Sequence, residues 1–147
     1  MTPLKNFNEF VEEGTVKKQY SDLSRAKFLA KESEKSYSFL SSIIKTIGIN
    51  ENSANSIIKL CYDTIMELVR AEMLIHGYKA FGQGSHEAEV SYLREIGFSE
   101  NEVLFANQLR YFRNSIIYYG KILDKEYANK VIEFMHKIYP KLKKLME

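Results

Sequence analysis

The sequence is poor in the residues that break helices or cross-link a chain. Its 147 residues include two prolines, seven glycines, a single cysteine and no tryptophan. So few prolines and glycines argue against a loop-rich β-sandwich and against a disordered tail. The lone thiol, Cys61, excludes an internal disulfide, and together with only three scattered histidines it argues against a zinc site. We therefore expect no metal and no other cofactor.

Long apolar runs and an excess of one charge are also missing. No segment approaches the roughly 18 apolar residues of a membrane helix, and the first residues, Met-Thr-Pro-Leu-Lys-Asn, lack the apolar stretch of a signal peptide. We therefore expect no membrane association and a cytoplasmic location, which also suits a lone thiol. Because the net charge is only +2, any contact with nucleic acid has to come from a local basic cluster.

The sequence does contain two long stretches with helical periodicity. Apolar residues recur at spacings of three and four from Val16 to Ile47, and again from Ile57 to Tyr78. Gly48 suits the left-handed residue that ends a helix, and a short polar loop follows it. A short connection makes consecutive helices antiparallel neighbours, so the sequence predicts one long helix pair as the scaffold of the fold.

Shorter helices are predicted on both sides of this pair. Before it, Thr2 would cap a helix that has Pro3 in its first position and ends at Gly14. After it, Ser85 would cap a short helix, and Asp124 would cap the last one. These caps are typical N-terminal signals because their side-chain oxygens accept hydrogen bonds from free backbone N–H groups.

The clearest helix start in the sequence is at Ser99. With Glu102 three residues on, Ser99 forms a capping box, and the helix it begins is predicted to reach about Tyr119. Pro140 should bend the last helix or end its regular part, since proline lacks a backbone N–H. The sequence therefore predicts a single all-α domain over residues 1–147, an up-and-down bundle of five to six helices.

The helix after Ser99 carries a row of polar residues. Residues three or four apart share a helix face, and this row consists of Asn107, Arg110, Asn114 and Tyr118. The opposite face, expected to enter the core, consists of Leu109, Phe112, Ile116 and Tyr119. Arg113 lies at the border, where a guanidinium can reach a phosphate without deep burial. The pattern by itself favours a solvated helix face over an anion site.

The run from Arg113 to Gly120, Arg-Asn-Ser-Ile-Ile-Tyr-Tyr-Gly, follows the long helix pair and a Gly-Ser-His loop at 84–86. In this combination the chain resembles the HEPN domains, the higher-eukaryote and prokaryote nucleotide-binding family. The resemblance implies a small helical domain whose late helix carries an arginine, a polar residue and, a few positions on, a histidine. It also implies a two-fold dimer with both motifs in one cleft, and many members of the family are metal-independent ribonucleases.

Carried over residue by residue, the resemblance makes Arg113 the motif arginine and Asn114 the polar residue. The histidine position falls on Tyr118, or on Tyr119 if one further spacer is allowed, and no histidine lies there. Tyrosine has an ordinary pKa of about 10, against about 6.5 for histidine, and is a poor base at pH 7. A missing general base removes about 10² to 10⁴ of rate. We therefore expect a weak or inactive nuclease that still binds phosphate.

Four further residues are candidate ligand contacts around this motif. They are Asn107, Arg110, Tyr119 and His86. His86 resembles the histidine of a Ser/Thr-His pair common at this place in the family. Taken alone, a loop histidine beside a helix start is more often a capping or surface residue.

Three functions from different classes are compatible with these residues. The first is a homodimer that binds RNA or a nucleotide around Arg113, a degenerate relative of toxin–antitoxin ribonucleases. The second is a noncatalytic helical adaptor that docks a partner, by family analogy a minimal nucleotidyltransferase. The third is a purely structural dimer. Salt-sensitive RNA binding would favour the first, because salt weakens phosphate contacts.

Overall fold

The structure is a computed structural model that describes residues 3–147. In this part of the chain, six helices and two short strands form an all-α bundle, which confirms the predicted fold class. In chain order they are α1 (Phe7–Glu12), β1 (Val16–Lys18), α2 (Leu23–Thr46), α3 (Ala54–Ile75), β2 (Tyr78–Ala80), α4 (Ser85–Glu95), α5 (Glu100–Tyr119) and α6 (Lys125–Leu145).

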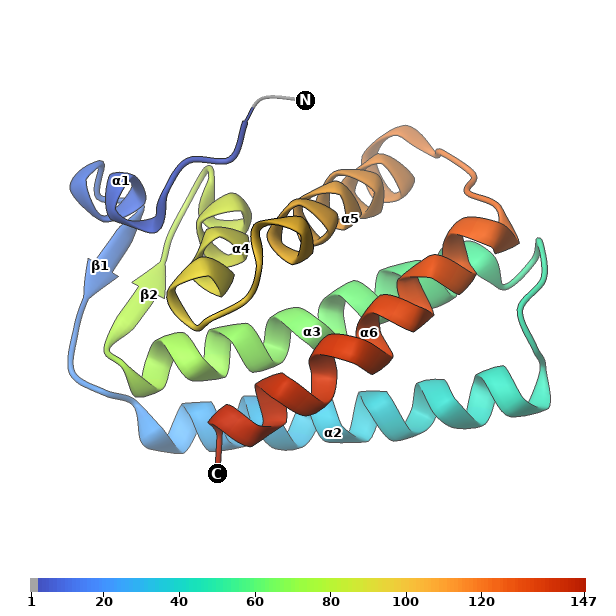
Figure 1. The fold of residues 1–147 in the computed structure, drawn as a ribbon, viewed down its shortest axis with the longest axis horizontal. Coiled ribbons are helices and arrows are strands. Elements are labelled where there is room, and N and C mark those ends of the chain that lie inside the picture. Colours follow the sequence, from blue (N-terminus) through green and yellow to red (C-terminus); the bar gives the residue numbers. More distant parts are fainter. Residues whose placement is uncertain (1–2) are drawn as a thin grey trace.

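The predicted long helix pair is the scaffold of the bundle. α2 and α3 run antiparallel along the whole molecule, and α6 lies across them on one side (Figure 1). α4 and α5 pack against another side of α3, so α3 lies at the centre of the bundle. Its buried residues therefore occur on every side of the helix rather than in one stripe.

The core is made mainly by α3 together with the apolar faces of its neighbours. Large side chains with almost no exposure include Leu40, Ile58, Ile65, Met66, Leu68, Met73, Leu93, Leu109, Met135, Ile138 and Leu142. They come from five of the helices. The tertiary packing of these faces, more than helix propensity, stabilises helices of this length in water.

Three predicted helix ends are confirmed. The Ser99 hydroxyl accepts a hydrogen bond from the backbone N–H of Glu102 at 3.2 Å, and the Glu102 carboxylate accepts one from the Ser99 N–H at 2.9 Å. Asp124 caps α6 by accepting from the Tyr127 N–H at 2.8 Å. Gly48, at φ +81°, lies just after the end of α2 in the left-handed conformation expected there.

The long helices are shorter than predicted because a two-stranded ribbon was missed. Val16 belongs to β1 and Tyr78 to β2, and the two strands pair in antiparallel register, with Val16 opposite Ala80. The chain leaves α3 at Gly77, which has φ +80°. A Cβ atom there would lie 2.5 Å from the backbone oxygen of Gln19, so the close approach of the two segments requires glycine.

Two predictions about the shorter helices are wrong. α1 begins at Phe7, so Pro3 lies outside it, and the predicted cap Thr2 lies outside the described residues. Ser85 is the first residue of α4 and not its cap. Gly84, at φ +86°, takes the cap position without any side-chain hydrogen bond. The left-handed conformation of Gly84 turns the chain into α4 one residue earlier than a serine cap would.

Pro140 does not end α6, which continues to Leu145. The proline is exposed on the outer side of the helix. The carbonyl that loses its intrahelical partner there can be hydrated, which lowers the cost of proline in a helix interior. Within residues 3–147, no helix is both long enough and apolar enough to cross a membrane.

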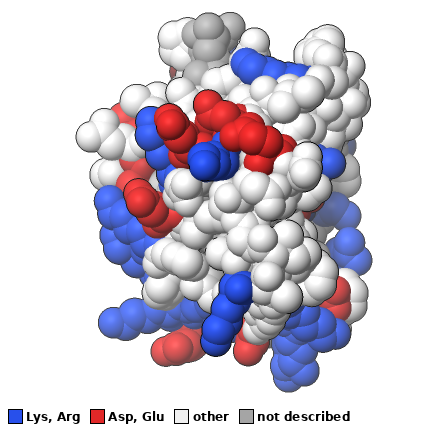
Figure 2. All heavy atoms as spheres, turned by 90° about the vertical axis from the view of Figure 1, so that its right-hand side faces the viewer, with Lys and Arg blue, Asp and Glu red and all other residues white. Residues whose placement is uncertain are grey.

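The turns after α2 and after α5 meet at one end of the molecule. The Asn55 side chain joins them by donating to the Lys121 carbonyl at 3.0 Å and accepting from the Leu123 N–H at 2.9 Å. Figure 2 shows this end. Lysines and arginines are mixed with acidic residues in its upper half and again along its lower edge, and a broad uncharged area lies between them.

Candidate functional site

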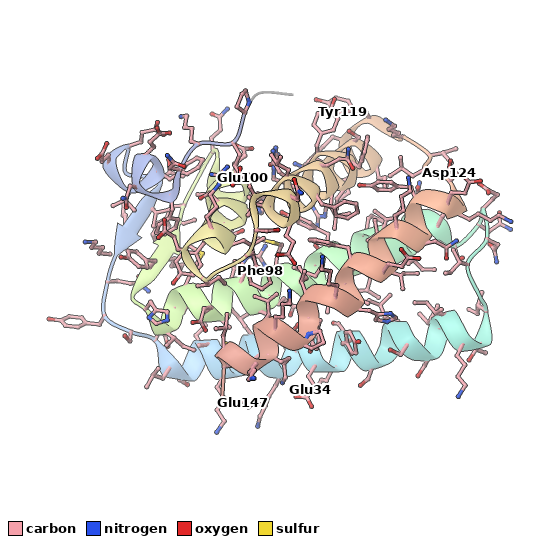
Figure 3. All side chains as sticks on the ribbon, viewed as in Figure 1. Glu34, Phe98, Glu100, Tyr119, Asp124 and Glu147 are labelled. Carbon is pink, nitrogen blue, oxygen red and sulfur yellow. The ribbon has the colours of Figure 1, made fainter. Side chains whose placement is uncertain are left out.

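The polar row on α5 is not a solvated helix face. Asn107 is 2% exposed and Arg110 is largely buried, whereas Leu109 and Ile116 enter the core as predicted. Tyr119 is 84% exposed, so its predicted place in the core is wrong. The last turn of α5 extends past the body of the bundle, and Tyr119 points away from it (Figure 3).

Arg113 links α5 to α3. Its Nη2 lies 3.2 Å from the Oδ1 of Asp63, and its guanidinium carbon lies 5.8 Å from the centre of the Tyr62 ring. The Arg113 side chain is 23% exposed, so its guanidinium reaches the surface between the two helices. Its Nε is buried and has no hydrogen-bond partner in the described part of the chain. The next residue, Asn114, is half-buried and its amide is likewise unpartnered within residues 3–147.

Tyr62 forms the buried side of this contact. Its hydroxyl is buried without a hydrogen-bond partner among the described residues. Burial, and after it the negative charge of Glu89, raises the pKa of Tyr62 far above its ordinary value, against the smaller effect of three nearby arginines. The hydroxyl therefore stays protonated at neutral pH and can donate a hydrogen bond but cannot act as a base.

Arg110 and Asn107 link α5 to α4. The Arg110 Nε donates to the Asn107 side-chain oxygen at 2.9 Å, and its Nη1 lies 3.1 Å from the Oε1 of Glu87. Both residues line a pocket of about 350 Å³ beside Tyr111 and the segment before α1. These two predicted ligand contacts thus lie together, one helical turn from Arg113.

His86 lies in a third group, which links α4 to α3. Its Nδ1 is 3.3 Å from the Oε1 of Glu89, while the Arg70 Nε donates to the Oε2 of the same carboxylate at 2.8 Å. Because His86 contacts Glu89, the structure does not pair it with Arg113. Nowhere between residues 3 and 147 do three or more His, Cys, Asp or Glu side chains form a group that could hold a metal ion.

Each pair of these three helices is therefore joined by one arginine–carboxylate contact. Asp63, Glu87 and Glu89, the three carboxylates, were not identified from the sequence. For Asp63 the sequence did offer an indication of an ion pair, because this charged residue stands within a helix that is apolar on most sides. With three arginines facing three carboxylates, the local charge is close to balanced.

The C-terminal end of α5 exposes large apolar side chains. The four in or just after its last turn are Ile117, Tyr118, Tyr119 and Ile122. Tyr118, which the resemblance places in the histidine position, is 71% exposed and lies three turns from Asn107. Lys121 places its Nζ 4.5 Å from the centre of the Phe112 ring at the same end. No family model, no curated protein and no solved structure matches this chain.

Proposed function

We propose that this chain is a HEPN-like helical protein that binds RNA or a nucleotide by holding a phosphate at Arg113. The observation that supports the proposal is the unpartnered Nε of a guanidinium that still reaches the surface, next to the unpartnered amide of Asn114. A buried donor without a partner costs about 1–3 kcal/mol. A phosphate oxygen bound there would recover that free energy.

Asp63 is the competitor that a phosphate has to displace. Its side chain is 42% exposed, and ion pairs this open to water contribute about 0–1 kcal/mol. Asp63 contacts the guanidinium through one oxygen at 3.2 Å. A phosphate can bind an arginine in a bidentate arrangement and carries more negative charge, so its hydrogen bonds to Arg113 would be stronger than this single contact. A phosphate can therefore replace Asp63 as the partner of Arg113 at little cost.

The exposed tyrosines support a nucleic-acid ligand over a free phosphate ion. Tyr118 and Tyr119 follow Arg113 by about one and a half turns and present their rings to solvent. Bases stack on such rings with about 1–3 kcal/mol each, without preference for sequence. We propose binding without efficient cleavage, because the Tyr62 hydroxyl stays protonated and no histidine accompanies Arg113.

The test is the affinity of the full chain for a fluorescein-labelled single-stranded RNA, measured by anisotropy over a range of salt concentrations. Arg113→Ala should weaken binding by about tenfold or more and flatten the salt dependence, because one charge-assisted phosphate contact is lost. Asp63→Asn should strengthen binding, since it removes the competing carboxylate. Lys130→Ala, an exposed residue of α6, is the matched control.

Circular dichroism of each variant checks that the helices are intact. The proposal is wrong if the wild-type chain shows no RNA affinity at low salt, or if Arg113→Ala binds as well as the wild type. If the wild-type chain cleaved RNA efficiently and Arg113→Ala did not, the site at Arg113 would be supported, but the proposal of binding without cleavage would be wrong.

A second candidate function is protein docking, as a homodimer or as a helical adaptor. It is favoured by the apolar end of α5, where Tyr119 and Ile122 are 84% and 78% exposed. Contiguous exposed apolar side chains of this size mark interaction surfaces in many soluble proteins. Stable co-purification with a nucleotidyltransferase, without RNA affinity, would favour the adaptor over RNA binding.

A further inference from the structure

A basic pocket lies where α2, α3, α4 and the ribbon meet. It has a volume of about 190 Å³, and its charged lining residues are Arg25 of α2, Arg70 of α3, Lys79 of β2 and Glu89 of α4. The other lining residues are mostly apolar and include Leu29 and Met73. Arg70 is two turns along α3 from Asp63, so this pocket is separate from the Arg113 contact.

The positive charge of this pocket is not neutralised from within. Both oxygens of its only carboxylate, Glu89, are already engaged, Oε2 by the Arg70 Nε at 2.8 Å and Oε1 by His86 at 3.3 Å. Neither Arg25 nor Lys79 has a carboxylate within 4.0 Å in the described residues. Three cations and one carboxylate leave the lining with a net charge of +2 at neutral pH.

The ribbon adds a further positive charge beside the pocket. Lys17 is directly opposite Lys79 in the strand pair, so both side chains lie on the same face. Their Nζ atoms lie 5.4 and 5.2 Å from the centre of the Phe81 ring. Like charges directly opposite each other in a sheet are unfavourable, and a bound anion would relieve this repulsion.

We propose that this pocket binds a small organic anion, a carboxylate or a phosphate monoester carried on a compact apolar group. The three cations would hold the anionic group, and Leu29 and Met73 would pack against the apolar part. The volume equals about six water molecules at about 30 Å³ each, which admits a head group and a short stem. Pockets that bind drug-sized ligands have volumes of about 300–1,000 Å³, so this pocket is too small for a ligand of that size. The inference does not depend on RNA binding at Arg113.

The experiment is an NMR titration of the full, ¹⁵N-labelled chain with phenyl phosphate, benzoate, inorganic phosphate and benzylamine. Phenyl phosphate or benzoate should produce saturable shifts at the Arg70 Nε–H and at the backbone amides of Lys79 and Ala80. Whichever of the two binds more tightly identifies the anionic group. Benzylamine, a cation of similar shape, should produce no saturable shifts there.

The double variant Arg25→Gln, Lys79→Gln should weaken binding by about tenfold or more, because two charge-assisted contacts are lost. Neither side chain has an ion-pair partner among residues 3–147, so the fold should tolerate their loss. Arg113→Ala should leave this binding unchanged, which separates the result from that of the RNA experiment. The inference is overturned if neither organic anion saturates, if inorganic phosphate binds as tightly as phenyl phosphate, or if the double variant binds normally.

Discussion

Arg110 and Arg113 are one turn apart on α5, yet their surroundings give them different roles. Arg110 is held on two sides, by Asn107 and by Glu87, and is almost fully buried. Arg113 has a single exposed carboxylate partner and a buried Nε without any partner in the described residues. Removing Arg110 would mainly loosen α4 from α5, whereas Arg113 is the arginine with capacity left for a ligand.

Cys61 offers a test of the packing at the scale of one residue. The thiol is buried in the middle of α3, and burial raises its pKa from 9.0 to about 12. Since the thiolate is the reactive form, Cys61 should not react with a disulfide reagent at pH 8 in the native state. It should react rapidly once the chain is unfolded in guanidinium chloride. Fast labelling of the folded chain would contradict this packing.

The raised pKa of Cys61 also determines how the stability of the fold changes with pH in alkaline solution. The unfolded chain releases the Cys61 proton near pH 9, while the folded chain keeps it until about pH 12. Between these values the folded state binds more protons, so its free energy of unfolding falls as the pH rises. Tyr127, whose pKa burial raises to about 12, contributes in the same direction.

At the scale of helices, α5 depends on the capping box at its start. Burial alone would raise the pKa of Glu102, but its hydrogen bonds with Ser99, together with the charges of Lys141 and Lys137, lower it below the ordinary value. The ionised Glu102 carboxylate therefore stabilises the folded chain above about pH 4.5, the ordinary pKa of a glutamate. This stabilisation is lost as the pH falls through the lowered pKa of Glu102.

Ser99→Ala should therefore lower the free energy of unfolding by about 1 kcal/mol at pH 7, because the N–H of Glu102 loses its acceptor. Urea unfolding at pH 7 measures this loss, which should shrink at acid pH. Ser41→Ala is the matched control, since Ser41 lies inside α2 and its hydroxyl bonds only the carbonyl of Tyr37. An equal loss of unfolding free energy in both variants would show that the capping box contributes no more than an ordinary serine inside a helix.

The ribbon could not be predicted from the same kind of pattern that identified the helices. Its strands have three residues each, too few for an alternation to be recognised. Val16 and Tyr78 also happened to continue the three-and-four spacing of the neighbouring helices, and this extended both predicted helices wrongly. Pairing between segments so far apart in the chain is a tertiary property.

At the scale of the whole molecule, the two ends differ in character. One end carries the ribbon with its lysines and the exposed Tyr20 and Phe81, and the other carries the exposed apolar residues of the α5–α6 turn (Figures 1 and 2). For the second candidate function, protein docking, we predict that the apolar end joins two copies of the chain. Burial of apolar surface stabilises a protein by about 25 cal/mol per Å². In a monomer these exposed side chains do not contribute this free energy, whereas in a dimer they would.

Light scattering after size exclusion should then give twice the chain mass of 17.1 kDa. The double variant Tyr119→Asp, Ile122→Asp should give the monomer mass, because unpaired carboxylates in an apolar interface are unfavourable. Tyr20→Asp is the control, since Tyr20 is just as exposed but lies beside the ribbon. A monomeric wild-type chain would rule out this dimer.

The fold class, the long helix pair and the starts of α5 and α6 were all predictable from the amino-acid sequence. These follow from periodicity and from caps such as Ser99 and Asp124, which act between residues close together in the chain. Sequence also singled out Arg113 as a border residue, although it could not identify Asp63 as its partner.

Which charges meet and which side chains face solvent depends on the packing of the helices and the ribbon in three dimensions. Tyr119 is exposed because α5 extends beyond the bundle, and the pocket between Arg25, Arg70 and Lys79 exists because three separate elements converge there. Such distances depend on how α2, α3 and the ribbon pack against one another, and the spacing of residues along one helix carries no information about the position of the next.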